Sequence, residues 1–395
     1  MLKKHHLLVL IITLVPLLIF VQPARAAENT QPEDGAVVCL PGVYVNTVSD
    51  CVASGPAQYL TELAQAGITF PPEPFPIQYP DLGLTYVEYQ YAQVRTDHAP
   101  VYGSLEQAIE GKEQNAIRRI DSPFSYISYY QDTVVNDARY YEIENGNWMT
   151  AIDVSRVTPP RFQGLTFTRT PSQSFGWVLS YLSKTSGYVE TKRTPGDQPE
   201  DYTGNHYNNH QLVWVYDTAE ADGIEWYMIG PNEWVPQIVI ARVIPNTTPP
   251  AGVPGDRWIE VNLFEQTIVV YEGYELVFAT LIASGLDPFW TRPGLFQIYK
   301  KLESTPMRGS FETDRSDAYY LEDVPWTMYF DEARALHGAY WRANLGFPQS
   351  HGCVNLSVGD SRWLFDWANL GDWVYVWDPS GETPTDPDYY GAGGA

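Results

Sequence analysis

Residues 350–355 read Ser-His-Gly-Cys-Val-Asn, and a His-Gly pair at residues 337–338 begins sixteen positions before the cysteine. A free thiol has a pKa near 8.5, so only about 3 % of it is thiolate at neutral pH. An imidazole that takes the thiol proton stabilises the thiolate as an ion pair. His351 is two residues before Cys353 and would point the same way along an extended chain, whereas His337 must come from a neighbouring strand. The stretch therefore predicts a cysteine nucleophile with a histidine base.

Gly352 lets the backbone turn tightly next to the cysteine. We therefore expect the amides of Gly352 and Cys353 to face the oxyanion that develops during acyl transfer. Two alternatives use the same residues. In one, Cys353 is buried and inert. In the other, His337, His351 and Cys353 bind zinc, but no fourth ligand is evident and a zinc-bound thiolate would not act as a nucleophile.

The motif Ser-His-Gly-Cys-x-Asn, with its upstream His-Gly, resembles the signature of YkuD-type L,D-transpeptidases. The resemblance covers residues 254–378, including alternating apolar strands within 259–271 and a Thr-Arg-Pro-Gly-Leu-Phe element at 291–296. It also includes a helix after the motif, whose start is predicted by Ser357 and Asp360 as a variant capping box. The resemblance implies a mainly β catalytic domain with one clear helix.

The resemblance also assigns roles to single residues. Cys353 corresponds to the acyl-accepting nucleophile and His337 to its base. The remaining positions correspond to the site wall and oxyanion donors or to polar residues that brace the loop: His351, Gly352 and Gly338 for the first group, Ser350 and Asn355 for the second. Ala339 is a departure, because many members carry Ser or Thr there. Neither a metal nor a cofactor is expected.

A substrate follows from the same resemblance. The acyl donor would be a peptidoglycan stem tetrapeptide, whose third residue forms a thioester with Cys353 as the terminal D-alanine leaves. A second stem peptide would be the acceptor and give a 3→3 cross-link, and carbapenem-type inhibitors would bind the same site. One alternative is an L,D-carboxypeptidase, in which water resolves the acyl-enzyme. Another is a non-catalytic wall-binding scaffold, which the departure at Ala339 favours.

The N-terminus predicts export. Lys3 and Lys4, an apolar stretch at residues 7–21 and Ala-Arg-Ala at residues 24–26 together form a signal peptide over residues 1–26. The apolar stretch is shorter than the roughly 20 residues that a membrane-spanning helix needs. No stable membrane insertion is therefore expected after cleavage, with an uncleaved anchor as the alternative. We expect the mature protein in the cell wall, the extracellular space or the periplasm.

Export and composition predict how the cysteines are paired and exclude two kinds of partner. In an oxidising compartment, the closely spaced Cys39 and Cys51 predict a local disulfide within an N-terminal segment, residues 27–76, and leave Cys353 free. The formal net charge of −24 repels nucleic acid and anionic lipid, so neither is an expected partner.

An internal repeat precedes the catalytic block. Residues 141–159 match residues 227–245 at a constant offset of 86, and each copy has a Tyr-x-Ile strand, a turn with Gly and Asn, a Trp and a second alternating strand. This pattern is typical of a β-hairpin. Each copy resembles the closing hairpin of bacterial SH3-like barrels. We therefore expect two SH3-like β modules, at 84–158 and 161–246, that position the enzyme without forming part of its active site.

Two further segments have simple predictions. A short helix is expected at residues 57–66. The tail at residues 379–395 lacks core-forming residues and is expected to be disordered.

Overall fold

The computed structural model describes residues 54–121, 124–185, 187–310 and 318–390. The predicted signal peptide and the predicted disulfide between Cys39 and Cys51 lie outside these residues. Backbone contacts divide the chain into two compact units, Met1–Gln65 and Ala66–Ala395. The described part of the first unit contains helix α1 (Pro56–Gln65), which confirms the helix predicted at 57–66. Of the helices in the described ranges, none is both long and apolar enough to cross a membrane.

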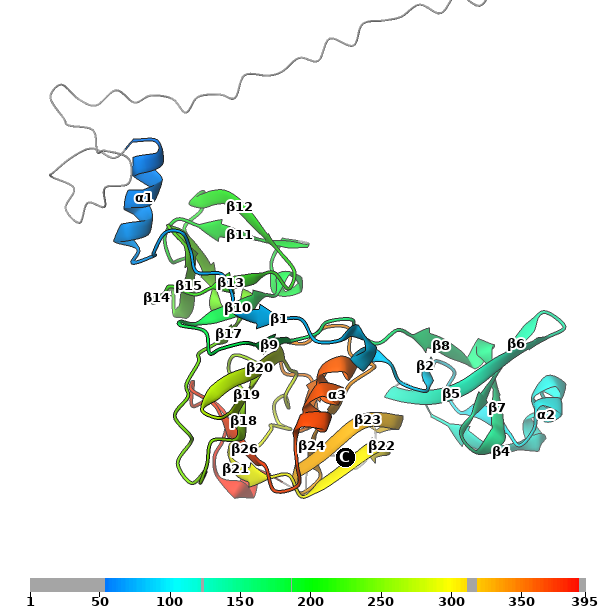
Figure 1. Cartoon of the computed structure of the whole chain (residues 1–395). Coiled ribbons are helices and arrows are strands. Elements are labelled where there is room, and N and C mark those ends of the chain that lie inside the picture. Colours follow the sequence, from blue (N-terminus) through cyan, green and yellow to red (C-terminus); the bar gives the residue numbers. More distant parts are fainter. Residues whose placement is uncertain (1–53, 122–123, 186, 311–317, 391–395) are drawn as a thin grey trace, which may run out of the picture. The chain divides into compact units, whose positions relative to one another are not determined.

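The second unit is mainly β, as predicted (Figure 1). Its C-terminal part, called here the catalytic block, consists of the strands β18 (Trp258–Asn262), β19 (Thr267–Glu272), β20 (Glu275–Leu281), β21 (Gly294–Gln297), β22 (Lys300–Gly309), β23 (Tyr319–Asp331), β24 (Arg334–Gly338), β25 (Val354–Leu356) and β26 (Trp373–Trp377), with helix α3 (Val358–Trp367). These strands belong to two sheets. One contains β20-β19-β18-β26-β21 and the other contains β25-β24-β23, with β22 paired to β23.

A shared apolar core joins the two sheets and helix α3. Ile259 and Val261 of β18, Met328 of β23, Leu336 of β24 and Leu364 of α3 all belong to it and are at most 1 % exposed. Burial of such side chains contributes roughly 1.5–3 kcal/mol each. The core therefore holds β24 and β25, the two strands next to the motif, in a fixed position.

Helix α3 begins at the predicted residues. The Ser357 hydroxyl accepts a hydrogen bond from the Asp360 amide at 3.1 Å, which caps the helix. Trp363 on its core side stacks on Phe278 of β20, with ring centroids 4.0 Å apart. The helix starts directly after β25, so its cap also fixes the end of the strand that follows the cysteine.

The upstream strands form two modules. The first, module 1, contains β2 (Gln90–Val94), β3 (Ala99–Tyr102), helix α2 (Leu105–Glu110), β4 (Ala116–Ile120), β5 (Phe124–Val135), β6 (Ala138–Ile143), β7 (Asn147–Thr150) and β8 (Val154–Val157). The second, module 2, contains β10 (Phe175–Val178), β11 (Tyr188–Lys192), β12 (Tyr202–Asn208), β13 (Leu212–Trp214), β14 (Asp217–Ala221), β15 (Ile224–Gly230), β16 (Glu233–Pro236) and β17 (Ile240–Val243). Their SH3-like identity stays a prediction.

The two repeat copies have the same local structure. Tyr141 pairs with Met149 between β6 and β7, and Tyr227 pairs with Val235 between β15 and β16, which is the same register at the offset of 86. Each hairpin continues into a 3-10 turn and a further strand, β8 or β17, that starts 86 residues apart in the two copies. The hairpin predicted from the repeat is therefore present in both modules.

Upstream strands continue the sheets of the catalytic block. β5 of module 1 pairs in parallel with β23, with Phe124 opposite Tyr319. β9 (Leu165–Phe167) pairs with β20, and β1 (Ile77–Gln78) pairs with β9. Module 1 and the two short strands β1 and β9 are therefore joined to the catalytic block by main-chain hydrogen bonds.

The tail differs from the prediction of disorder up to residue 390. The Asp378 carboxylate accepts hydrogen bonds from Ser380 and Thr383, and a 3-10 helix η7 (Pro387–Tyr389) follows. Tyr390 lies over the Arg334 guanidinium, 5.2 Å from ring centroid to carbon. Aspartate, serine and threonine side chains order this segment by capping its turns, without any core residue. Residues 391–395 lie outside the described ranges.

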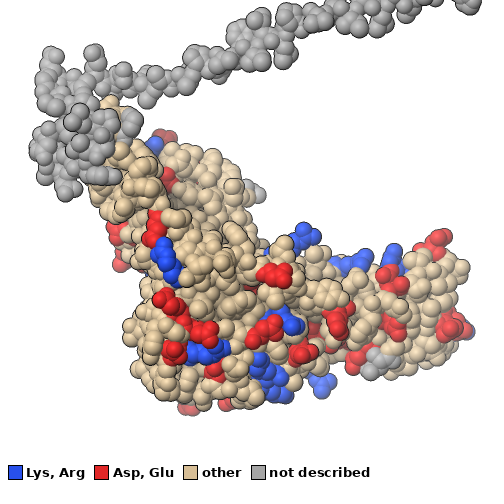
Figure 2. Space-filling view, viewed as in Figure 1, with Lys and Arg blue, Asp and Glu red and all other residues tan. Residues whose placement is uncertain are grey.

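Charged side chains are mixed over the visible face of the molecule. Figure 2 shows acidic and basic groups side by side on this face, in agreement with the many ion pairs of the described residues.

Candidate active site

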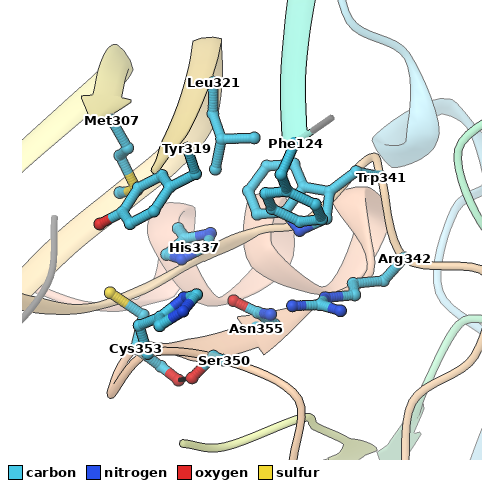
Figure 3. A pocket seen from close by; sticks show the side chains of 11 residues that line it. Phe124, Met307, Tyr319, Leu321, His337, Trp341, Arg342, Ser350, Cys353 and Asn355 are labelled. Carbon is cyan, nitrogen blue, oxygen red and sulfur yellow. Dashed lines mark hydrogen bonds between the residues drawn. The ribbon is translucent and has the colours of Figure 1, made fainter. Parts of the chain in front are cut away.

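The pairing of β24 with β25 places the predicted residues together. In this parallel pair His337 lies opposite Asn355, and Cys353 comes directly before β25. Side chains two positions apart on a strand point to the same face. Cys353 and Asn355 therefore share the face of His337, and Figure 3 shows all three around one pocket.

The pocket combines predicted residues with residues that sequence reasoning missed (Figure 3). Five predicted residues line it: His337, Ser350, His351, Cys353 and Asn355. Six others line it as well: Phe124, Met307, Tyr319, Leu321, Trp341 and Arg342. Gly338 and Gly352, predicted as wall residues, do not line it.

The missed residues differ in how detectable they were. Trp341 and Arg342 follow the His-Gly pair within five residues, so their closeness to the motif was a usable signal. Phe124 is on β5 of module 1, more than two hundred residues before Cys353. Nothing in its local sequence indicates a pocket, and its position contradicts the expectation that the modules take no part in the active site.

Cys353 is a buried thiol. Cys353 is 5 % exposed, and its Sγ lies 3.8 Å from the carbonyl oxygen of Ala333. Burial raises the pKa of Cys353 to about 11, although a backbone hydrogen bond at Ala335 and the charge of Arg334 act in the opposite direction. The thiol is therefore neutral at pH 7.

His337 is a buried, neutral imidazole. Burial lowers its pKa to about 4, against a smaller opposing effect of the Gly338 carbonyl. Nδ1 lies 3.3 Å from that carbonyl oxygen, an arrangement that assigns the proton to Nδ1 and leaves Nε2 as the acceptor. The resting pair is thus neutral thiol and neutral imidazole. The expected thiolate–imidazolium ion pair is not the resting state, because burial disfavours both charges.

The motif loop is fixed by Ser350. Its hydroxyl donates to the carbonyl oxygen of Cys353 at 2.5 Å and accepts from the amide of Gly352 at 3.1 Å. Its own amide donates to the carbonyl oxygen of Ser284 at 2.9 Å. Since the Gly352 amide is engaged by Ser350, the prediction that it faces the oxyanion is wrong. The amide of Cys353 remains the predicted donor.

Gly338 and Gly352 permit the local backbone conformation and close packing, and they do not line the pocket. Gly352 has a φ of +117°, which residues with a Cβ rarely adopt. A Cβ on Gly338 would lie 2.6 Å from the Ser361 hydroxyl and 2.9 Å from Pro325. Gly338 therefore allows helix α3 to pack closely against β24, next to His337.

Further side chains fix the walls of the pocket. The Thr291 hydroxyl, in the Thr-Arg-Pro-Gly-Leu-Phe element, donates to the carbonyl oxygen of Gly352 at 2.9 Å and accepts from the Gly285 amide. The His351 ring stacks on Tyr319 with centroids 5.4 Å apart and contacts Phe289 at 4.9 Å. His351 is thereby held as a wall residue between two aromatic rings.

The fold and the pocket define a class of protein: a mainly β catalytic domain in which a thiol and an imidazole face one pocket. A family model, the YkuD L,D-transpeptidase catalytic domain, matches residues 256–376. These residues are therefore a YkuD L,D-transpeptidase catalytic domain, as the motif predicted.

Individual proteins are similar to this part of the chain. YciB of Bacillus subtilis (strain 168), assigned as an L,D-transpeptidase, is 25 % identical over 127 residues, which cover 28 % of this chain and 59 % of YciB. An L,D-transpeptidase structure from Stackebrandtia nassauensis is 25 % identical and covers 34 % of this chain and 60 % of its own, with a TM-score of 0.27. The catalytic domain of an E. faecium L,D-transpeptidase is 27 % identical and covers 32 % of this chain and 100 % of its own, with a TM-score of 0.29. The chain thus spans about three fifths of the first two proteins.

Proposed function

We propose that this protein is an exported L,D-transpeptidase that forms 3→3 cross-links in peptidoglycan through a thioester at Cys353. One observation carries the proposal: Cys353 and His337 reach one pocket from the same face of two adjacent chain segments. The family of the catalytic domain supplies the substrate class. The predicted export depends on residues 1–26, which lie outside the described part of the chain.

The neutral resting pair indicates how the thiol is activated. The pKa values of Cys353 and His337, about 11 and about 4, differ by about 7. Moving the proton from sulfur to imidazole before substrate binds is therefore unfavourable, because burial opposes the charge on both groups. Proton transfer is expected to accompany attack on the substrate. General-base assistance of this kind contributes typically about 10²–10⁴-fold.

The first half-reaction makes the thioester. Sγ of Cys353 bonds to the carbonyl carbon of the donor's third residue, while Nε2 of His337 accepts the thiol proton. The amide of Cys353 donates to the oxyanion that forms. His337 then passes the proton to the nitrogen of the departing D-alanine as the carbon–nitrogen bond breaks.

The second half-reaction uses the same groups in reverse. The side-chain amine of a second stem peptide attacks the thioester carbonyl and gives a proton to His337. The carbon–sulfur bond breaks, and the proton returns to the sulfur of Cys353. Water in place of the amine would give the carboxypeptidase reaction.

Intact-mass analysis of the full chain tests the proposal. A carbapenem and a stem tetrapeptide should each add one acyl group to the parent protein and none to Cys353→Ala. With a second stem peptide present, a cross-linked dimer should accumulate. Release of tripeptide alone would assign the carboxypeptidase alternative, and the absence of any adduct on a folded parent would leave the scaffold alternative.

A further inference from the structure

Arg342 is a pocket residue whose charge has no acidic partner among the residues that the structure describes. It follows β24 and lines the pocket together with His337, Cys353 and Asn355. Figure 3 shows its guanidinium group directed toward the Asn355 side chain. Its charge also contributes to the lowered pKa of His337, so the guanidinium interacts with the catalytic imidazole.

The hydrogen bonds of Arg342 are incomplete. Nη2 donates to the carbonyl oxygen of Gln349, and Nη1 lies 3.4 Å from its side-chain oxygen. Nε is buried, and no acceptor for it exists among the residues that the structure describes. A guanidinium has five donors, so several are left for a ligand. Both acceptors are neutral amide oxygens of Gln349, which orient the group but leave its charge uncompensated.

Several other arginines of the catalytic block are paired with acids. Arg292 and Arg334 both bind Asp331, and Arg257 binds Asp372. The chain has 48 acidic residues against 24 basic ones, so carboxylates are abundant. For Arg342 no ion pair within 4 Å is found in the described ranges. Burial lowers its pKa to about 10, which still leaves it charged at pH 7.

The surroundings hold the guanidinium in place. Gln349 is itself fixed by a hydrogen bond from its amide nitrogen to the carbonyl oxygen of Asn344 at 2.9 Å. On another side, Phe124 of module 1 lies with its ring centroid 5.7 Å from the guanidinium carbon. A desolvated, oriented cation is suited to a carboxylate, because a charge-assisted hydrogen bond is strong where water is excluded.

We propose that Arg342 binds the terminal carboxylate of the acyl donor and thereby selects donors whose leaving amino acid ends in a free acid. This inference rests on the proposed function. The carboxylate of a leaving D-alanine is one carbon away from the nitrogen that departs from the scissile carbonyl. It therefore belongs in the same small pocket as the thiol. The asparagine next to Arg342 would contact the same part of the donor.

The test compares two donors that differ only in this group. A stem tetrapeptide ending in D-alanine and its C-terminal amide are given to the full-length protein, and kcat/KM for thioester formation is measured by intact mass. The parent should prefer the acid by roughly 10- to 100-fold, the range expected for one charge-assisted interaction. In Arg342→Gln the ratio of the two kcat/KM values should fall to about threefold or less, because only the acid donor loses an interaction with the guanidinium. Arg342→Lys should retain part of the preference, since it keeps the charge but not the two-pronged geometry.

Controls separate the possible failures. Arg161→Gln removes the same charge from an exposed position and should keep the parental preference. An unchanged preference in Arg342→Gln, or an equal loss with both donors, would overturn the role of Arg342 while leaving the proposed function in place. If Arg342→Gln does not fold, Arg342→Lys is the test. A preference for the acid donor below that of the parent supports the role of Arg342, and a parental preference overturns it. If the parent itself forms no thioester with either donor, the proposed function fails and this inference falls with it.

Discussion

The two repeat copies have the same local structure but different relations to the catalytic block. Module 1 reaches it through strand β5, which pairs with β23 and brings Phe124 into the pocket. Module 2 reaches it through Glu265, in the turn between β18 and β19, whose carboxylate accepts from Arg242 Nε at 2.8 Å and from the Tyr227 hydroxyl at 2.7 Å. One module thus contributes to the active site, and the other holds a buried carboxylate of the scaffold.

Equivalent repeat positions show how this difference arises. Arg242 corresponds to Arg156 at the offset of 86, yet Arg156 is exposed and donates to the hydroxyl of Tyr129 within its own module. The side chain of Glu265 is completely buried although it lies in a turn between two strands. The repeat therefore predicts the local structure of each module. The contacts that a module makes with the catalytic block depend on residues outside the repeat, such as Glu265.

The largest expected effect comes from replacing the equivalent arginines. Arg242→Ala should lower the free energy of unfolding by about 3–5 kcal/mol, because it leaves Glu265 buried without its charge partner. Arg156→Ala should cost about 1 kcal/mol or less, since its hydrogen bonds are near solvent. Urea unfolding of both variants measures the difference. Equal losses would mean that Glu265 does not distinguish the two modules.

The second prediction concerns the loss of folding stability at low pH, which we expect to be larger at the pocket than in module 2. The pKa of His337 is lowered to about 4 from an ordinary value near 6.5, so the unfolded chain takes up a proton before the folded one does. The stability associated with neutral His337 is present above pH 6.5 and is lost as the pH falls through 4, by about 3 kcal/mol between pH 7 and pH 4.

The measurement is the free energy of unfolding at both pH values for parent and His337→Gln. The variant should lack this part of the acid sensitivity. His210→Gln in module 2 is the comparison, because burial lowers the pKa of His210 as well, but it is only partly buried. A larger change for His210 than for His337 would place the acid-sensitive site in the module instead of the pocket.

The sequence predicted those parts of the site that depend on local patterns. Cys353, Ser350 and His351 are within four consecutive positions, and His337 lies on a strand that immediately precedes the motif loop. Ser357 and Asp360 predicted the helix start for the same reason, because a cap involves neighbouring residues. Short-range chemistry is visible in a sequence without knowledge of tertiary contacts.

The missed features depend on contacts between distant segments. Phe124 reaches the pocket because β5 pairs with β23, and one sequence gives no register for such a pairing. The neutral state of Cys353 and His337 depends on burial by the assembled walls, which the motif does not specify. The Gly352 amide was assigned to the oxyanion because its use by Ser350 requires knowing how the loop closes.

The last prediction concerns the module that reaches the pocket. Phe124→Ala removes an aromatic wall and the ring beside Arg342, and we expect acylation of Cys353 by a carbapenem to slow by about tenfold, which corresponds to about 1.4 kcal/mol. Phe124→Leu keeps an apolar wall and should lose less. The measurement is the second-order rate of adduct formation by intact mass.

A matched variant in module 2 completes the comparison. Tyr207 is a partly buried aromatic residue that packs on the core of module 2, so Tyr207→Ala removes similar packing without touching the pocket. Its acylation rate should equal that of the parent even if its free energy of unfolding decreases. If Phe124→Ala also keeps the parental rate in a folded protein, strand β5 only attaches module 1 to the catalytic block. In that case the two modules differ in how they are attached but not in what they contribute to the reaction.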